Sequence, residues 1–305
     1  MEAMELQALT HIYSPGTVYE KKALDHIDLT LFAGECVGII GHTGSGKSTL
    51  VQHMNALLTP TSGRVLLNGE DIRADKKKLK QVRQQVGLVF QYPEHQLFGE
   101  TVYEDVAFGP RNMGFSAAET DDRVREALTL VGLKESAYQK SPFELSGGQK
   151  RRAAIAGVLS MRPSILILDE PAAGLDPAGR DEILSHIKRT HAEMKNTVVL
   201  VSHSMEDVAK MADRIVIMSK GAIVSIGTPA EVFAQEEMLT DIGLAVPQIS
   251  RLMGKLARKG IDVPQGIFTV EEAVRVLMAR RAADGPLTSV EAEAARILAK
   301  RRGDE

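Results

Sequence analysis

The sequence has few of the features that mark several common classes of protein. It holds a single cysteine in 305 residues, Cys36, which excludes an internal disulfide and fits a reducing compartment. No run approaches ~18 consecutive apolar residues, so no segment is predicted to span a bilayer. The first residues, Met1–Glu5, lack the basic and apolar regions of a signal peptide, and we expect none. Cys36 lies in an apolar run, which predicts a buried and unreactive thiol.

The chain also lacks a strong excess of one charge and any visible internal repeat. Its formal net charge is −3, so it has no general attraction to nucleic acid or to anionic lipid. We therefore expect no nucleic-acid partner, and a membrane location would require a protein partner. Apolar residues make up 44% of the chain and charged residues 25%, as in ordinary globular proteins.

A glycine-rich segment gives the first indication of chemistry. It reads Gly41, His42, Thr43, Gly44, Ser45, Gly46, Lys47 and Ser48, and fits the phosphate-binding pattern G-x-x-x-x-G-K-[ST]. An apolar run at 35–40 precedes it and a segment with helical spacing follows, which is the strand–loop–helix context that this loop requires. The glycines let successive N–H groups point at an anion, and the helix adds its positive end. Lys47 should reach the β- and γ-phosphates of ATP, Ser48 should ligate Mg²⁺, and Thr49 should add a phosphate contact.

A second apolar run, at 165–168, ends in two carboxylates, Asp169 and Glu170. Asp169 is placed to hold hydrated Mg²⁺, as the second acidic element of a P-loop site does. Glu170 lies beside the metal position rather than on it, which suits a general base that deprotonates the attacking water.

The segment Leu145, Ser146, Gly147, Gly148 and Gln149 lies far downstream of the P-loop. Together these motifs resemble the ATPases of the ABC transporter family, whose signature sequence this segment matches without a substitution. Its glycines expose N–H groups at the start of a helix, which suits binding a γ-phosphate. In the family, that phosphate belongs to ATP held by a second cassette.

The resemblance implies roles for further residues. Gln91 matches the loop glutamine that contacts Mg²⁺ and the attacking water, and His203 matches the histidine that contacts the γ-phosphate. Leu175 and Asp176 match a loop that communicates across the dimer, although Ala173 and Gly174 depart from the commoner Ser-Ala.

The adenine requires a flat surface, which the family usually supplies as an aromatic residue near the N-terminus. Tyr13 is our first candidate. Tyr19 is the alternative, because the loop at 14–22 is longer than usual in the family, and its alignment with the family pattern does not decide between the two tyrosines.

A narrower resemblance covers almost the whole chain and points to the energy-coupling factor (ECF) transporter ATPases. The segments that match this family are Gly16-Thr17 with 20–24, 91–98, 102–109, 143–152 and the pattern at 244–247. It implies an importer of a vitamin or a transition-metal ion at the cytoplasmic face of the cell membrane. The partners would be a second ATPase, alike or different, a transmembrane coupling subunit and a substrate-capture subunit. A conventional importer ATPase and a non-transport ABC ATPase are the alternatives.

The expected fold is α/β: an ABC cassette with a RecA-like parallel sheet core, an antiparallel β subdomain and a helical signature subdomain at about 92–161. We place the cassette at 1–236 and a small helical extension at 237–305, in which 289–302 has the pattern of an amphipathic helix.

The segment after Gln91 is rich in apolar and acidic side chains, which suits a groove for an amphipathic helix of a partner. Our hypothesis at this stage is that Glu94 or Glu104 pairs with an arginine on that helix.

Overall fold

The structure is a computed structural model that describes residues 1–75, 78–264 and 266–284. The strands are β1 Glu2–Tyr13, β2 Lys21–Phe32, β3 Cys36–Ile40, β4 Ser62–Leu67, β5 Glu70–Asp71, β6 Val86–Val89, β7 Ile165–Asp169, β8 Thr197–Val201, β9 Arg214–Ser219 and β10 Ala222–Gly227. The α-helices are α1 Lys47–Met54, α2 Leu79–Gln85, α3 Val102–Met113, α4 Ala117–Leu130, α5 Gly147–Leu159, α6 Pro177–Met194, α7 Met205–Met211, α8 Pro229–Phe233, α9 Glu236–Asp241, α10 Gln248–Arg258 and α11 Val270–Asp284. Short 3-10 helices are η2 Pro93–Gln96, η3 Glu135–Ala137 and η4 Pro142–Glu144.

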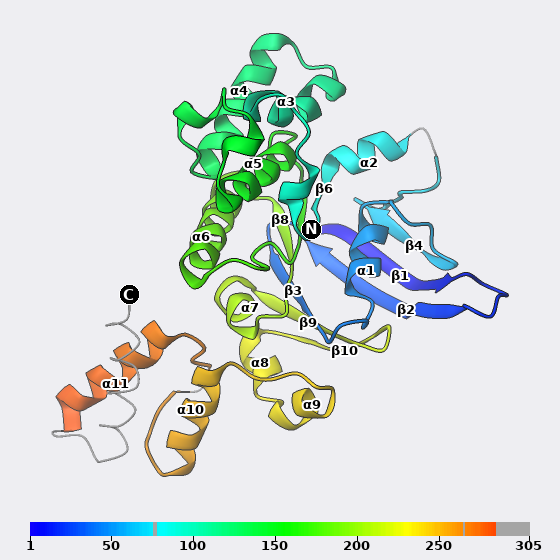
Figure 1. Ribbon diagram of the computed structural model, residues 1–305. Helices are drawn as coiled ribbons and strands as arrows, with labels where there is room; N and C mark the ends of the chain where they lie inside the picture. The colour runs from blue at the N-terminus through cyan, green and yellow to red at the C-terminus, as the bar shows by residue number, and fades with distance from the viewer. Residues whose placement is uncertain (76–77, 265, 285–305) are drawn as a thin grey trace. The chain divides into compact units, whose positions relative to one another are not determined.

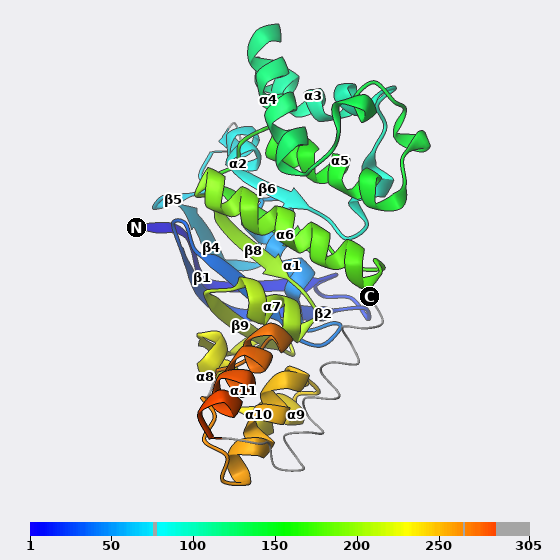
Figure 2. The same ribbon diagram turned by 90° about the vertical axis from the view of Figure 1, so that its left-hand side faces the viewer.

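A six-stranded sheet with the order β10-β9-β3-β8-β7-β6 forms the centre of the first compact unit, which comprises residues 1–203 and 211–226. The five strands from β9 to β6 are parallel. Strands β3, β7 and β8 are buried along their whole length, as expected for a parallel sheet covered on both faces. Figure 2 shows α6 lying across one of these faces. This confirms the predicted parallel core, and it brings the loops after β3, β6, β7 and β8 to one edge of the sheet.

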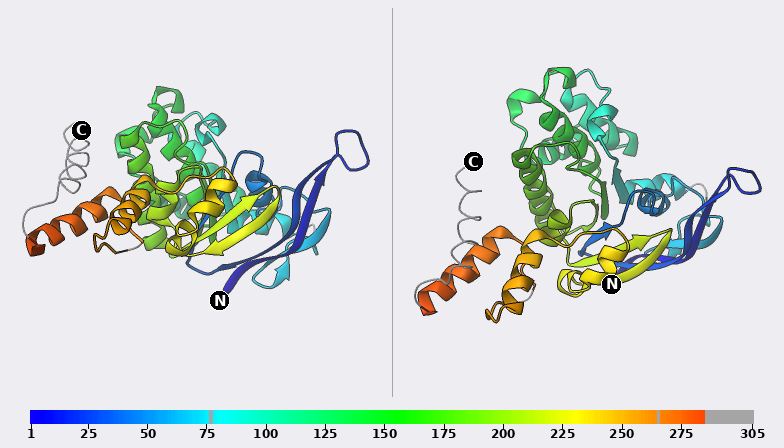
Figure 3. Two further views of the ribbon diagram at one scale, coloured as in Figure 1. Left: turned by 90° about the horizontal axis from the view of Figure 1, so that it is seen from below. Right: turned by 60° about the horizontal axis from the view of Figure 1, so that its bottom comes forward.

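The second sheet is antiparallel and has the order β2-β1-β4-β5. Asn68 and Gly69 join β4 to β5 as a two-residue turn with both φ angles positive, the conformation that an Asn-Gly pair favours in a hairpin. A hydrophobic core lies between the two sheets and includes Leu50 and Met54 of α1. Figure 3 shows the exposed loop between β1 and β2 projecting beyond the sheet.

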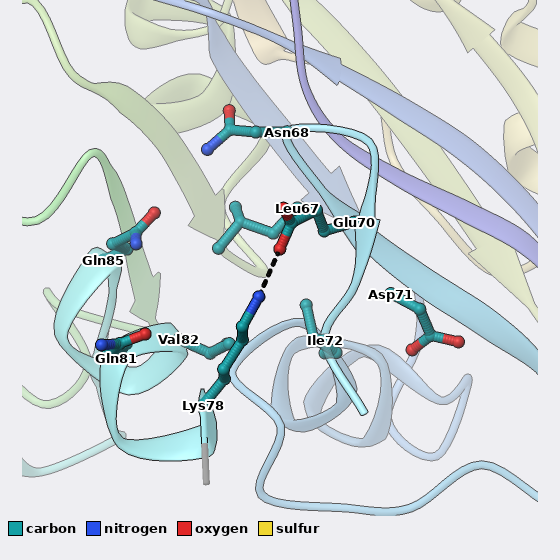
Figure 4. A pocket seen from close by; sticks show the side chains of 9 residues that line it. All are labelled: Leu67, Asn68, Glu70, Asp71, Ile72, Lys78, Gln81, Val82 and Gln85. Atoms are coloured by element: carbon teal, nitrogen blue, oxygen red, sulfur yellow. Dashed lines mark hydrogen bonds and ion pairs between the residues drawn. The ribbon is translucent and has the colours of Figure 1, made fainter. Parts of the chain in front are cut away.

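Helix α2 faces the β4–β5 hairpin across a small open pocket of about 270 Å³ (Figure 4). An ion pair between Lys78 Nζ and Glu70 Oε2, 3.0 Å long, spans this pocket. Both side chains are exposed, so solvent screens the pair and its contribution to stability is small. The amides of Gln81 and Gln85 line the same side as Lys78.

Helices α3, α4 and α5 pack against one another and gather beside the six-stranded sheet (Figure 1). Serine and threonine side chains cap each of them: Thr101 for α3, Ser116 for α4 and Ser146 for α5. The segment from Pro93 to Leu159 contains no strand among its residues, all of which the structure describes. It corresponds to the helical subdomain predicted at about 92–161.

The second compact unit comprises residues 204–210 and the described residues from Gly227 onward. It begins at Gly227 rather than at the expected residue 237, because Thr228 caps α8 and Phe233 of α8 packs on Phe268, with ring centroids 5.4 Å apart. Its own core joins α10 to α11 through Met253, Leu256 and neighbouring apolar residues. The amphipathic helix predicted at 289–302 lies outside the described residues. Within the described part of the chain, no helix has both the length and the apolar character needed to cross a bilayer.

Candidate functional site

The P-loop connects the carboxyl end of β3 to the N-terminus of α1, as its sequence context predicts. Gly46 has a φ of +104°, and a Cβ there would lie 2.6 Å from the carbonyl oxygen of Ala23. At Gly41 a Cβ would overlap the carbonyl oxygen of Met218. Both positions therefore require glycine. No side chain caps the N-terminus of α1, so its N–H groups remain available to an anion.

Lys47 is buried at the first position of α1, and its ammonium donates to the loop itself. Its Nζ lies 2.7 Å from the carbonyl oxygen of Gly41 and 3.1 Å from that of His42. Burial lowers the pKa of Lys47, while Glu170 and Asp169 oppose this effect. The P-loop thus holds a cation at its centre that can exchange these carbonyls for phosphate oxygens.

The carboxylates that end β7 lie at the same edge of the sheet. Asp169 is buried, and burial raises its pKa, while a hydrogen bond from the Ser48 hydroxyl and the charge of Lys47 oppose the rise. Asp169 and Ser48 are therefore neighbours, as a shared Mg²⁺ site requires. Hydroxyl and carboxylate oxygens are hard ligands that Mg²⁺ prefers, so Ser48 and Asp169 are a chemically suitable pair of donors.

Glu170 follows directly and has an unusual backbone, with a φ of +53°. Its Oε1 lies 3.2 Å from Nε2 of His203, and the carboxylate is largely buried while the imidazole is half exposed. Burial and the charge of Lys47 lower the pKa of His203, so its ring is neutral at neutral pH. A carboxylate held next to a neutral imidazole can accept a proton from water while the ring donates a hydrogen bond.

Gln91 follows β6 at the same edge of the sheet, and its side chain is exposed. Tyr13, at the end of β1, lies beside the first turn of α1, because its hydroxyl is 3.1 Å from Oγ1 of Thr49. Its ring packs edge-on against His11 and is 39% exposed. Tyr19, by contrast, is 81% exposed in the projecting loop. The structure therefore brings Tyr13, and not Tyr19, next to the P-loop helix.

The signature segment begins α5, on a part of the structure separate from the P-loop helix. Ser146 and Gln149 form a capping box: Oγ of Ser146 accepts from the Gln149 N–H, and Oε1 of Gln149 accepts from the Ser146 N–H. A Cβ built on Gly147 or Gly148 would meet nothing within 4 Å. Among the described residues, no packing requires these two glycines, so the surface they form is open to another molecule. Helix α5 packs on α3 and α4, whereas α1 packs on β2 and β7.

Glu94 and Glu104, the acidic residues expected to meet a partner arginine, each have an arginine partner within the chain, so a contact with a partner arginine would have to share or replace these pairs. Glu94 accepts two hydrogen bonds from Arg151, at 2.6 and 2.9 Å. Glu104 forms a two-point ion pair with Arg111 on the same helix. The role of Arg151 was not predictable from the sequence, because its partner Glu94 lies 57 positions away in the chain.

Cys36 is 2% exposed, and burial raises the pKa of its thiol to about 12. The thiol is therefore unreactive at neutral pH, which confirms the prediction.

The sequence and the fold of this chain are both similar to those of known proteins. The ABC transporter family model matches residues 24–173. The energy-coupling factor transporter ATP-binding protein EcfA2 of Symbiobacterium thermophilum is 56% identical over 284 residues, which cover 92% of this chain and 98% of the relative. EcfA2 of Clostridium tetani is 52% identical over 277 residues, which cover 90% of this chain and 96% of the relative.

Solved structures with a similar fold belong to the same family as these relatives. The structure of cbiO1 from Clostridium perfringens, described as part of the ABC transporter complex cbiONQ, has a TM-score of 0.71 at 40% identity and covers 83% of this chain and 99% of that chain. An ATP-binding cassette solved as a dimer in a post-hydrolysis state with ADP and Pi has a TM-score of 0.67 at 30% identity and covers 74% of this chain and 98% of that chain. The fold is that of an ABC ATPase, and this chain belongs to the ABC transporter family, within the energy-coupling factor transporter ATP-binding proteins.

Proposed function

We propose that this protein is the ATP-hydrolysing subunit of an energy-coupling factor importer. The observation that carries the proposal is the open N-terminus of α5, where Gly147 and Gly148 have no neighbour that would exclude a side chain. One chain therefore holds a phosphate-binding loop and, on separate elements, a second phosphate-binding surface without a partner of its own. Two such cassettes, alike or different, can each cover the nucleotide of the other. The subunit would attach to the cytoplasmic face of the membrane through protein partners.

The residues of one site have the following roles in this proposal. The N–H groups at 41–49 and the ammonium of Lys47 bind the phosphates of ATP, and Ser48, Gln91 and Asp169 hold Mg²⁺, which supplies charge neutralisation to the phosphates. Glu170 takes a proton from the attacking water, and His203 and Gln91 align that water. Loss of the γ-phosphate removes the bridge between the cassettes, so the nucleotide state biases an equilibrium between open and closed dimers.

Tyr13 is the proposed surface for adenine. The Tyr13→Ala variant should raise KM for ATP about 10-fold, in the range found when a base loses an aromatic stacking partner, with little change in kcat. The Tyr19→Ala variant is the matched control, because it removes the same side chain from the projecting loop. Steady-state ATPase assays check both; an effect of Tyr19→Ala that exceeds that of Tyr13→Ala would exchange the two assignments.

A groove between α2, α3 and α5 is the proposed contact for the membrane partner. It has a volume of about 670 Å³ and is lined by Leu97, Phe98, Phe108, Met113, Val158 and Met161 among others. Phe98 is 66% exposed and Phe108 51%, and their rings pack edge to face with centroids 4.9 Å apart. Large exposed aromatic side chains beside a groove are typical of a surface that receives an amphipathic helix. Apolar side chains outnumber the charged ones of Lys80, Arg83 and Asp105 in its lining, so this groove is proposed to bind mainly through apolar contacts.

The double variant Phe98→Asp/Phe108→Asp tests the groove. We expect it to fold, because both rings are exposed, and to lose copurification of the membrane subunits from detergent-solubilised membranes. ATP binding by the variant should remain. The control is Phe143→Asp, which changes an aromatic residue that is 81% exposed elsewhere on the surface. Retention of all membrane subunits by the double variant would show that the groove is not the contact.

The broader assignment is tested by a tagged pull-down from solubilised membranes with mass spectrometry of the partners. Recovery of a second cassette, a helical coupling subunit and a small membrane protein is the expected result. The small membrane protein would identify the imported compound, for which a vitamin or a transition-metal ion is proposed. Recovery of ribosomal or DNA-bound partners without a membrane protein would contradict the transport function.

A further inference from the structure

Arg151 connects three segments that carry the chemistry proposed above. It lies in α5 and is 2% exposed. Its Nε and Nη2 atoms donate to the two oxygens of Glu94, at 2.9 and 2.6 Å, in η2 just after Gln91. Its Nη1 donates to the carbonyl oxygens of Pro171, at 3.3 Å, and Ala173, at 2.6 Å, in the segment that follows Glu170.

Tyr92 closes the same cluster. The guanidinium of Arg151 lies 5.9 Å from the centroid of the Tyr92 ring. A Cβ built on Gly174 would be in van der Waals contact with the edge of that ring, 3.5 Å from Cε1 of Tyr92. Tyr92 has a φ of +55°, in the left-handed region that residues other than glycine rarely adopt. Glu94 is 15% exposed, and burial, the largest single effect, raises the pKa of its carboxyl. The hydrogen bonds and charge of Arg151, with a backbone hydrogen bond and the charge of His95, together outweigh burial, so the net pKa is lowered.

We propose that Arg151 is a positioning residue that makes the Gln91 loop, the signature helix and the segment after Glu170 move as one unit. This inference rests on the roles proposed above for Glu170 and for the signature surface. If α5 moves when a second cassette closes over the nucleotide, the carbonyls of Pro171 and Ala173 must follow or lose their hydrogen bonds. A partner that binds at the groove near Glu94 would therefore change the position of the general base, Glu170, through the contacts of one guanidinium. A guanidinium has five donors in a rigid fork, whereas a lysine ammonium cannot bond a carboxylate at two points and two carbonyls together.

The test uses the assembled transporter, with MgATP as the probe. In Arg151→Met, we expect kcat to fall about 100-fold, as a small misplacement of catalytic groups produces, with KM for ATP within about twofold of the unmodified protein. Arg151→Lys should keep an intermediate kcat. The double variant Glu94→Gln/Arg151→Met leaves no unpaired buried carboxylate, so it separates loss of positioning from failure to fold; its kcat should be as low as that of Arg151→Met.

Two further measurements make the result specific. Arg125→Met is the matched control, since Arg125 also forms ion pairs, with Asp121 and Glu135, but is half exposed on α4; its kcat should not change. Backbone hydrogen exchange in Arg151→Met should accelerate in peptides covering 91–95 and 170–176, and stay unchanged at 36–54.

Three results have distinct meanings. If kcat stays within about twofold in Arg151→Met and in the double variant, the positioning role is wrong. Faster exchange throughout the cassette, including 36–54, would also overturn it and leave Arg151 as a general structural residue. Glu170→Gln is measured in parallel: normal turnover by that variant would refute the proposed base and the site, whatever the Arg151 variants do.

Discussion

Replacing Glu170 with glutamine should lower kcat for ATP by about 10²–10⁴-fold while ATP still binds. The amide keeps the size of the side chain and the contact that the carboxylate makes with His203, 3.2 Å away, but it cannot accept a proton. The P-loop contacts of 41–49 are untouched, so ATP affinity should be retained. Because the γ-phosphate then persists, the closed dimer should accumulate with MgATP. Single-turnover assays and light scattering after gel filtration measure the two effects.

The control for this variant is Glu70→Gln, which removes the charge from an exposed carboxylate on the antiparallel sheet. Its turnover should equal that of the unmodified protein. Normal turnover by Glu170→Gln would mean that another group accepts the proton, and His203 would be the next residue to examine.

The second large effect is expected at the signature surface. Gly148→Asp places a carboxylate near the N-terminus of α5, where the helix dipole favours negative charge, and its Cβ meets nothing within 4 Å. The variant should therefore fold as well as the unmodified chain. In a dimer, however, that carboxylate would face the γ-phosphate of the other cassette, and kcat should fall about 10²–10³-fold.

The location of this defect can be checked directly. ATP binding to the monomeric variant should be normal, because its own P-loop is intact, and the closed dimer should fail to form. Gly157→Asp, the same change later in α5 where a Cβ is equally free of contacts, should leave turnover in solution unchanged. A monomer of Gly148→Asp that cannot bind ATP would contradict the assignment of this surface to the other cassette's nucleotide.

The sequence was sufficient for local elements whose signals are short-ranged. The P-loop, the buried strand before Asp169 and the helix that starts at the signature segment each depend on residues within a few positions of one another, and all are found in the structure. The boundary between the two units was less well predicted. It depends on Phe233 meeting Phe268, 35 positions later, and no local pattern reports that contact.

The partner of Glu94 shows the same limit at the candidate site. An acidic residue in an apolar segment suggested a contact with another protein, whereas the buried Arg151 satisfies it within the chain. The choice between Tyr13 and Tyr19 was open for a similar reason. Only the antiparallel pairing of β1 with its neighbours sets which tyrosine reaches Thr49.

The sequence by itself was sufficient to propose the chemistry of this protein: the pattern of a phosphate-binding loop, a candidate metal-binding carboxylate, a candidate base and a candidate second phosphate-binding surface. Each follows from residue types at fixed spacing, because local backbone geometry and side-chain chemistry suffice to define it. The tertiary structure alone decided which side chains meet across long separations, namely Tyr13 with the P-loop helix, His203 with Glu170, and Arg151 with the segments around it. Those contacts depend on how the sheets and helices pack, and packing arises from the whole chain rather than from any one motif.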